Sequence, residues 1–582
     1  MKIFNYPTHD VRRSGPLKMK FFLKYTFPVA SCVLRSLFLT FLFSPVLQAA
    51  LSDKAIAVTS DLRATKAATE VLGQGGNAID AAVAAAWVLN VVQPQSSGLG
   101  GSGYLLFYDI GTRRILFFDG SVQTPAEVFA EMFFDEKGEL RPYRSDRNTG
   151  GLPVGTPGLL KLLEEVHARY GTQKFSFAKL FDPAIQEAGG AAAVSASLAQ
   201  AIQEHKERLA LFDAGRGLFL KNNQPVSAES KISQPDLAKT FRLIQSKGIR
   251  IFYEGEIAKA IVQTVQKNSF RPGFLNYRDL EDYSVARRDP IHITYEGYDV
   301  FSVSPPAAGG IMLFRALNIL SQFGLAGFGK TAETYHILEE TQKHAFTGGL
   351  AIADPDVFEV PLEELLSEKW AQELRESIKF DKVLRLKDSQ KNTPETGRKQ
   401  MLSSVLVADT HGNIAALTMT LGDAFGSAVM VPGYGFFLNN QLTDFNATPD
   451  LVKKGEAVNI PSPGQRPRAP VVSTLVFEKG KPFLVMDAYG DEDPAAVLMN
   501  LFVQKIDFGR TCADSIAASR VLDREGILWM EPGIYAQETM RVKLELLGHK
   551  IEKKEKIGTA QMICFEDSSG KIAGESDPRQ TL

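Results

Sequence analysis

Apolar and polar residues recur with two different periods along the chain, and these periods predict both helices and strands. Residues 61–76, DLRATKAATEVLGQGG, predict a helix that ends at its glycine pair. Residues 77–92, NAIDAAVAAAWVLNVV, are almost wholly apolar and alanine-rich, so we expect a helix buried against a sheet. Residues 103–109, GYLLFYD, and 113–119, RRILFFD, predict two strands joined by a Gly-Thr turn.

The second half of the chain repeats this mixture after a long helical stretch. Residues 155–385 are predicted to be mostly helical, with a strand-like segment at 290–303. Residues 381–400 are polar and rich in helix breakers, which predicts an exposed linker. Beyond it, 403–421 and 473–488 predict two hairpins. Strands therefore gather at both ends of the chain, which favours a layered α+β sandwich over a regular βαβ series.

The composition limits the possible partners. The chain has 582 residues, of which 44% are hydrophobic and 23% charged, and this suits a globular protein of roughly two to four domains. Its formal net charge is −2 and it has no long basic run, so no electrostatic footprint for nucleic acid is present. We expect a small-molecule or peptide ligand and no nucleic-acid partner.

Residues 1–50 are typical of an export signal. A positive region is followed by the apolar stretch SLFLTFLFSPV at 36–46 and by small residues at 47–50 that suit cleavage. The apolar run is too short for a membrane span, so we expect no stable span after signal removal and a periplasmic or secreted protein. Alternatives are a lipoprotein box at 29–32, a twin-arginine signal at Arg12-Arg13, or a start at Met19.

Two further motifs point to no cofactor. Residues 98–103, GLGGSG, satisfy a dinucleotide-binding pattern, but they follow a predicted helix and enter a strand, so close backbone packing is the better interpretation. The eight histidines are scattered without metal-ligand spacing, which predicts no metal site. Asp354-Pro-Asp356 and Glu363-Glu364 are interpreted as solvated loop and helix-cap charges. After signal removal only Cys512 and Cys564 remain, enough for one disulfide, whose formation the sequence leaves open.

The most informative polar cluster lies in residues 433–449, GYGFFLNNQLTDFNATP. Asn439, Asn440, Gln441 and Asp444 stand beside an apolar run. One interpretation is a polar pocket wall in which Asp444 holds an ammonium group. The other is an asparagine-rich turn that caps a strand.

Five long segments, in the same order, resemble the γ-glutamyltransferases, also called glutathione hydrolases. They are 70–109 (EVLGQGGNAIDAAVAAAWVLNVVQPQSSGLGGSGYLLFYD), 153–171 (PVGTPGLLKLLEEVHARYG), 305–320 (PPAAGGIMLFRALNIL), 433–445 (GYGFFLNNQLTDF) and 574–580 (GESDPRQ). The resemblance implies a four-layer αββα sandwich of the N-terminal-nucleophile hydrolase type. It also implies a precursor that cuts itself into a large and a small subunit, here 51–400 and 401–582, intertwined in one domain. The threonine freed by the cut transfers the γ-glutamyl group of glutathione-type amides to water or an acceptor amine.

At the nucleophile position this chain departs from the family. The family motif Thr-Thr-His-x-Ser-Val-Val-Asp aligns with 402–409, LSSVLVAD, and places Leu402 where the nucleophile belongs. Leucine has no group that attacks a peptide bond. Ser403 is the alternative nucleophile, but neighbours on a strand point to opposite faces, so it requires a shift of the chain. Ser404 shares the face of Leu402 but lies further into the strand.

Other positions that the family uses for chemistry also differ. The residues found there are Ser121 for the arginine that grips the α-carboxylate, Ala469-Pro470 for a serine pair, Gly490-Asp491 for the oxyanion glycines, Gly422 for an asparagine, and Thr347-Gly348-Gly349 for Ala-Asp-Arg. Arg113 and Arg114 lie near Ser121 in sequence but are assigned to a hairpin turn. The family residues that remain are Thr420 and Gly490 for catalysis and Asn440, Gln441 and Asp444 for substrate binding.

These differences predict a family member that has lost self-cleavage and glutamyl transfer and that persists as one chain. Its function would then be the binding of a small molecule or peptide, γ-glutamyl compounds among the candidates. The alternative is an active γ-glutamyl or other amide hydrolase, acylase-like, which uses Ser403 after self-cleavage.

Overall fold

The computed structural model of the chain describes most of the compact unit Ala49–Leu582. The described residues are 50–52, 55–346, 351–384, 400–447, 458–490, 493–565 and 571–580. The predicted export signal, most of the predicted linker, Asp491 and the segment Thr347-Gly348-Gly349 lie outside them. Among the helices of the described ranges, none has the length and apolar character needed to cross a bilayer.

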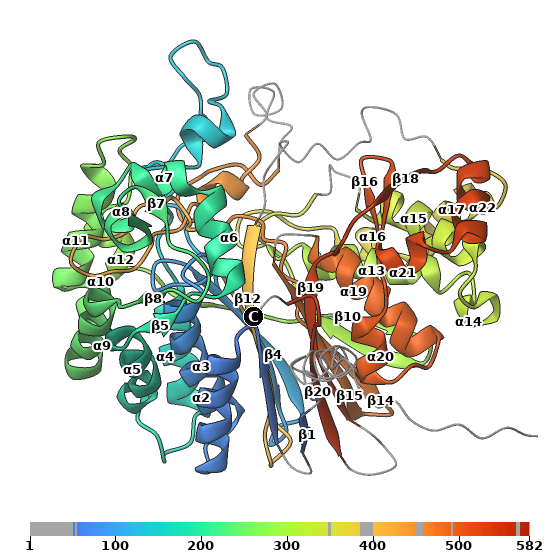
Figure 1. Cartoon of the computed structure of the whole chain (residues 1–582), viewed down its shortest axis with the longest axis horizontal. Helices are drawn as coiled ribbons and strands as arrows, with labels where there is room; N and C mark the ends of the chain where they lie inside the picture. Colours follow the sequence, from blue (N-terminus) through green and yellow to red (C-terminus); the bar gives the residue numbers. More distant parts are fainter. Residues whose placement is uncertain are drawn as a thin grey trace, which may run out of the picture. The chain divides into compact units, whose positions relative to one another are not determined.

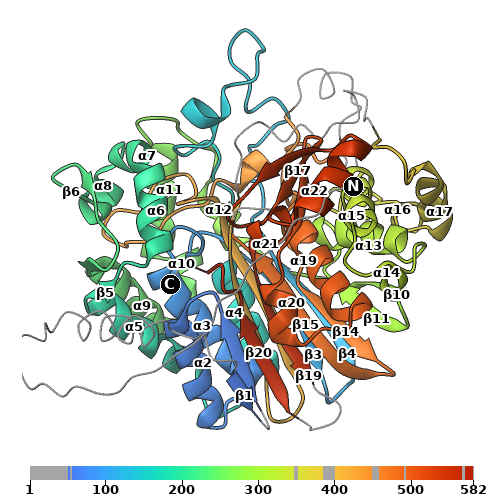
Figure 2. The same ribbon diagram turned by 45° about the vertical axis from the view of Figure 1, so that its right-hand side comes forward.

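Two antiparallel sheets form the centre of this unit (Figures 1 and 2). The six-stranded sheet has the order β2 (Ile56–Thr59), β12 (Gln400–Ala408), β13 (Ile414–Asp423), β3 (Ser102–Asp109), β4 (Arg114–Gly120), β9 (Ala286–Arg288). The seven-stranded sheet has the order β1 (Ala50–Ser52), β20 (Ile572–Ser576), β19 (Thr559–Phe565), β15 (Lys481–Tyr489), β14 (Thr474–Glu478), β11 (Tyr298–Ser302), β10 (Ile291–Tyr295). A small third sheet joins β16 (Val521–Arg524), β17 (Ile527–Met530) and β18 (Lys550–Lys553).

Strand alternation assigns each residue of β12 to one of two apolar layers. Leu406 and Ala408 pack between the two sheets, against residues such as Val485 of β15. Val405 and Val407 point the other way, into the cluster shared with the helices. This period of two is the geometry expected of a strand that is buried on both faces.

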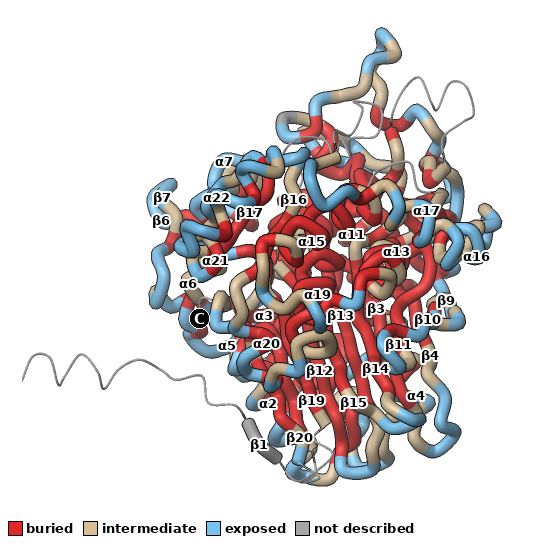
Figure 3. Tube along the Cα trace, turned by 90° about the vertical axis from the view of Figure 1, so that its right-hand side faces the viewer, coloured by how far each residue is buried: buried red, intermediate tan, exposed pale blue. Residues whose placement is uncertain are grey.

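Helices cover the outer face of each sheet, which completes the predicted four-layer αββα sandwich (Figures 1 and 2). The six-stranded sheet is covered mainly by α2 (Leu62–Gly73), α3 (Ala78–Val92), α4 (Leu159–Tyr170), α5 (Asp182–Gly189), α9 (Pro235–Lys247) and α11 (Glu256–Gln266). The seven-stranded sheet is covered mainly by α13 (Gly309–Leu320), α15 (Ala332–Ala345), α17 (Glu368–Ser377), α19 (Pro494–Phe502), α20 (Cys512–Ala517) and α22 (Glu538–Leu547). Figure 3 shows that both sheets and the helices packed directly on them are mostly buried.

The helix α3 explains much of this packing. Its Asn77 cap accepts the backbone N–H of Asp80, whose carboxylate accepts the N–H of Asn77, so both ends of a capping box are made. Every residue from Ala78 to Val92 is buried, and Trp87 stacks on Phe181 with ring centroids 4.5 Å apart. The predicted buried helix is therefore confirmed.

The other predicted elements also form. The helix predicted at 61–76 is α2, the first strand pair is β3 and β4, and the two hairpins are β12–β13 and β14–β15. The glycines at 98–103 serve close packing, since a Cβ on Gly100 would lie 2.1 Å from the carbonyl oxygen of Phe437. Cys512 and Cys564 are joined by a disulfide.

Candidate active site

The peptide bond between Met401 and Leu402 lies near the start of β12, where the pairing of β12 with β13 shifts register. The carbonyl of Met401 accepts a 2.7 Å hydrogen bond from the hydroxyl of Thr420 on β13. The N–H of Leu402 donates to the carbonyl of Gly490 at 3.3 Å, and the N–H of Gly490 donates to the carbonyl of Leu402 at 3.4 Å. Leu402 is only 3% exposed. The residue at the predicted cleavage position therefore has a buried hydrocarbon side chain, and its backbone is paired with Gly490, directly after β15.

Ser403 occupies the opposite face of β12, as the strand period predicts. Its hydroxyl lies 2.6 Å from the hydroxyl of Ser96 and 2.8 Å from the side-chain carbonyl of Gln93, both in the segment that follows α3. Gln93 is itself fixed, because its amide N–H donates to the backbone carbonyl of Ser60 at 2.7 Å. Hydroxyl and amide groups are thus the partners of Ser403 that the described residues provide, and neither group is a base at neutral pH.

The other face of β12 is covered by a titratable group from β15. Asp487 of β15 lies fully buried between the sheets and accepts the hydroxyl of Thr418 at 2.7 Å. Thr418 also contacts the hydroxyl of Ser473 at 2.7 Å. Desolvation by burial raises the pKa of Asp487 to about 6. Ser404 is buried on this inter-sheet side, opposite Thr418 in the register of β12 and β13.

The predicted pocket-wall residues lie close to the same strand. Asn440 accepts the backbone N–H of Asp423 at 2.9 Å, so its amide oxygen serves the end of β13. Gln441 accepts the hydroxyl of Ser102 at 2.6 Å, while its amide nitrogen is buried without a hydrogen-bond acceptor among the described residues. Asp444 accepts the amide of Gln400, the first residue of β12, at 2.5 Å. The fold therefore brings Asp444 to the start of the strand that carries Leu402.

Gly422 cannot be replaced without disturbing this wall. Its φ is +95°, a conformation that favours glycine. A Cβ at this position would also lie 2.2 Å from the side-chain oxygen of Asn440. The close approach of the two segments therefore depends on the missing side chain.

The position predicted for a carboxylate clamp is closed. Ser121 is fully buried, its N–H donates to Asp119, and its carbonyl accepts the hydroxyl of Tyr283 at 2.7 Å. The predicted hairpin-turn position of Arg113 and Arg114 is confirmed, because Arg113 has a φ of +54° in the turn before β4.

Two arginines that the sequence did not single out are buried beside this position. Arg288 lies 3.0 Å from Asp119 and 2.9 Å from Asp354, and the backbone N–H of Arg466 donates to Asp354 at 2.8 Å. The side chain of Asp354 is 1% exposed, so its interpretation as a solvated loop charge is wrong, whereas that of Asp356 is 55% exposed. Burial raises the pKa of Asp354. These arginines come from distant segments, which left no local sequence signal.

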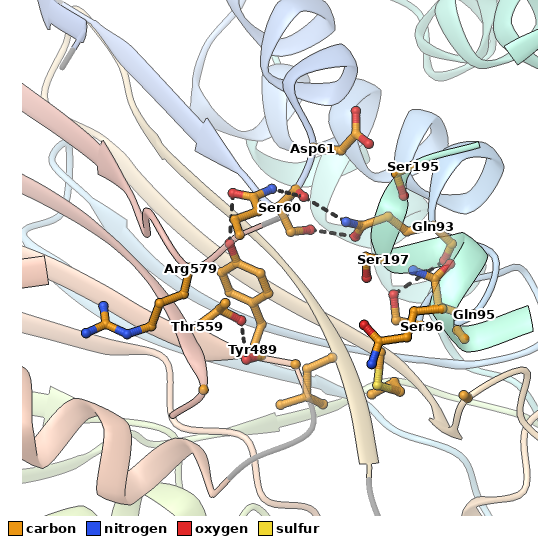
Figure 4. Close-up of a pocket in the computed structure, with 18 of the residues that line it drawn as sticks. Ser60, Asp61, Gln93, Gln95, Ser96, Ser195, Ser197, Tyr489, Thr559 and Arg579 are labelled. Atoms are coloured by element: carbon orange, nitrogen blue, oxygen red, sulfur yellow. Dashed lines mark hydrogen bonds between the residues drawn. The ribbon is translucent and has the colours of Figure 1, made fainter. Parts of the chain in front are cut away.

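A pocket of about 140 Å³ opens beside Leu402 (Figure 4). Its wall is rich in hydroxyl, amide and charged groups, and it includes Ser60, Asp61, Gln93, Gln95, Ser96, Ser195, Ser197, Gln200, Glu204, His205, Met401, Leu402, Tyr489, Gly490, Lys556, Thr559, Arg579 and Gln580. Gln93 and Ser96, the partners of Ser403, thus belong to this wall. Asn440, Gln441 and Asp444 lie outside it, and their substrate-binding role stays a prediction.

The charges of this pocket are partly fixed. Arg579, in the segment 574–580, pairs with Asp577 at 3.0 Å and with Glu531, and these two ion pairs fix its guanidinium group. Burial lowers the pKa of His205 to about 4, so its ring is neutral at physiological pH. The side-chain oxygen of Gln95 is buried without a hydrogen-bond donor among the described residues. The pocket therefore offers mostly neutral donors and acceptors.

Comparisons with known proteins agree with this architecture. A family model described as gamma-glutamyltranspeptidase matches residues 64–581. The chain is 33% identical to a glutathione hydrolase proenzyme of Bacillus subtilis (strain 168) over 532 residues, 88% of each chain, and 31% identical to that of Escherichia coli (strain K12) over 529 residues, 89% of each. The crystal structure of a cephalosporin acylase from Bacillus halodurans superposes with a TM-score of 0.81 at 26% identity and covers 93% of this chain and 97% of the acylase.

Proposed function

Because the chain belongs to the gamma-glutamyltranspeptidase family, we propose that it keeps the family's fold and pocket but has lost self-cleavage and glutamyl transfer. The family supports γ-glutamyl transfer, glutathione hydrolysis or an acylase-like reaction as the chemistry from which this chain departs. The observation that carries the proposal is Leu402 at the position of the nucleophile. We propose an exported, single-chain protein that acts by binding.

The lost chemistry follows from what an N-terminal nucleophile needs. A hydroxyl must attack the preceding carbonyl, and the amine that the cut releases must then serve as its base. Leu402 supplies no hydroxyl, and the N–H of Gly490, the family's oxyanion donor, is bonded to the carbonyl of Leu402. Ser121 removes the charge-assisted pairing that would select a glutamyl α-carboxylate. The nucleophile, the oxyanion donor and the carboxylate-binding group are therefore all affected.

The pocket supports the binding of a small polar ligand. Its volume of about 140 Å³ is below the several hundred Å³ typical of drug-sized ligands. Hydroxyl and amide groups dominate its wall, and these groups pair with the amides of a short peptide as well as with water. We propose a small molecule or a peptide side chain as the occupant, with γ-glutamyl compounds as the first probes.

One observation favours an active alternative. The carbonyl of Leu402, which precedes Ser403, already accepts the N–H of Gly490. An attack by Ser403 on that carbonyl would therefore have one oxyanion donor in place. Against this mechanism stands the environment of Ser403, whose hydroxyl contacts Ser96 and Gln93 and no basic group among the described residues.

The intact mass of the purified, denatured protein separates the two proposals. We expect one unbroken chain after expression with the export segment, and no hydrolysis of a γ-glutamyl anilide. A Leu402→Thr variant should remain inactive on that substrate, because the clamp and the oxyanion site are altered as well. Two fragments that meet between Leu402 and Ser403, and that disappear in a Ser403→Ala variant, would overturn the proposal and identify Ser403 as the nucleophile.

A further inference from the structure

A second cluster of reactive side chains lies in the helical layer over the seven-stranded sheet. His336 and Glu340 are one helical turn apart on α15, so they share a face of that helix. His549 follows α22 and precedes β18. All three residues are buried, and their ligating atoms lie within 4.8 Å of one another. None of the three belongs to the pocket wall beside Leu402.

The two histidine rings are held so that one nitrogen of each points to the other. Nε2 of His336 lies 2.6 Å from the carbonyl oxygen of Lys379, which can only accept, so this nitrogen carries the hydrogen. Nδ1 of His336 therefore presents its lone pair to Nε2 of His549, 2.7 Å away. Nδ1 of His549 contacts the carboxylate of Glu339. A carbonyl or carboxylate behind each ring is the arrangement that orients histidines bound to a metal.

The charges around the rings call for a cation. Glu339 and Glu340 lie 3.1 and 2.7 Å from the ammonium group of Lys343, and Asp523 interacts electrostatically with Glu339 and Lys343. The acidic groups of this cluster therefore outnumber its one amine. One oxygen of Asp523 is buried without a donor among the described residues. Uncompensated charge is costly in a buried position, and a divalent cation would neutralise it.

Glu340 offers the third ligand atom of the set. A metal ion binds histidine through a ring nitrogen that carries a lone pair, as Nδ1 of His336 does here. The carboxylate of Glu340 accepts Lys343 and the backbone N–H of Leu384, and its remaining lone pairs are available to a third bond.

We propose that His336, Glu340 and His549 bind a divalent metal ion of the zinc class. Two nitrogens and one carboxylate oxygen favour Zn²⁺ or Co²⁺ over Ca²⁺ and Mg²⁺, which prefer oxygen ligands alone. The metal replaces the hydrogen between the two rings: Nε2 of His549 releases this proton, and the hydrogen that Nδ1 of His549 shares with the carboxyl group of Glu339 then stays on Nδ1. Glu339 is a positioning residue. The ion would tie α15 to the segment between α22 and β18.

A metal titration of the full chain, free of any histidine tag and treated with a chelator, tests the proposal. We expect one equivalent of Zn²⁺ to bind, and Co²⁺ to give the visible absorption of a four-coordinate site. His336→Gln and His549→Gln should weaken binding by more than about 100-fold, and Glu339→Gln by about 10- to 100-fold. His344→Gln is the matched control, because this histidine lies on the same helix but contacts Ser377.

The titration of the wild-type protein decides the question even if a variant fails to fold. Absence of stoichiometric uptake at tens of micromolar Zn²⁺ would overturn the proposal and leave Lys343 as the cation of the cluster. Uptake that persists unchanged in both histidine variants would place the metal elsewhere and overturn it equally. Neither outcome depends on whether the chain cuts itself at residue 402 or 403.

Discussion

Asp487 provides the sharpest test of the electrostatics between the two sheets. Its carboxyl group is fully buried beneath the strand that carries Leu402, and it accepts hydrogen bonds from Thr418 and from the backbone N–H of Ala488. Burial raises its pKa from 3.8 to about 6, because the charged form loses its hydration there. The isosteric variant Asp487→Asn removes the titration; its amide oxygen can accept one of these bonds, and its NH2 group can donate to the hydroxyl of Thr418.

The sign of the effect follows from proton linkage. The folded state binds the Asp487 proton more tightly than the unfolded state, so this group contributes its full stability below pH 3.8 and loses it as the pH rises through about 6. A pKa difference of about two units corresponds to about 3 kcal/mol at 1.36 kcal/mol per unit. The wild-type protein should therefore lose about 3 kcal/mol relative to Asp487→Asn between pH 4 and pH 7.5.

Urea unfolding of both proteins at a series of pH values measures this difference. Other titrating groups act equally in the two proteins and cancel in the comparison. The free energies of unfolding should lie closest near pH 4 and diverge as the pH rises. Two curves that run parallel from pH 4 to pH 7.5 would refute the reasoning, since they would mean that Asp487 has an ordinary pKa in the folded protein.

Three further predictions concern stability. Replacing Cys512 and Cys564 by serine opens a cross-link over a separation of 52 residues and should cost about 4 kcal/mol of unfolding free energy in denaturant titrations; a change below about 1 kcal/mol would contradict this. Gly422→Asn, which introduces the residue that the family resemblance implies, should lower the free energy of unfolding by about 1–3 kcal/mol through its positive φ and its clash with Asn440; an unchanged melting temperature would show that the wall can move. Ser121→Arg should lower the free energy of unfolding by about 3–5 kcal/mol, because it buries an unpaired charge. If γ-glutamyl compounds reduce this loss, the new guanidinium binds them.

The sequence pattern predicted individual helices and hairpins correctly. The helix α3 is almost wholly apolar and the hairpin β12–β13 alternates around a Gly-Asn turn, so each element could be located from its own residues. The same period placed Leu402 and Ser403 on opposite faces of one strand, as the structure confirms. The four-layer architecture followed from the family resemblance and is confirmed as well.

Long-range clusters escaped the sequence analysis. His336 and His549 are 213 residues apart, and the i,i+4 spacing of His336 and Glu340 is common on any helix, so nothing local marked them as partners. The buried pairing of Arg288 with Asp354 was missed for the same reason, because its partners are far apart in the sequence. The pocket beside Leu402 draws its wall from both ends of the chain, and its shape depends on packing that no single segment encodes.

The central place of β12 has a consequence for any two-band pattern on a denaturing gel. β12 pairs with β2 on one side and with β13 on the other, so residues on both sides of the linker belong to one sheet. A host protease that nicks the chain anywhere in residues 385–399 would leave two pieces that co-purify as one particle. Such a nick would imitate maturation while creating no new chemistry. The N-terminal residue of the smaller piece, read by sequencing, therefore distinguishes an autocatalytic cut from an accidental one, whereas the number of bands does not.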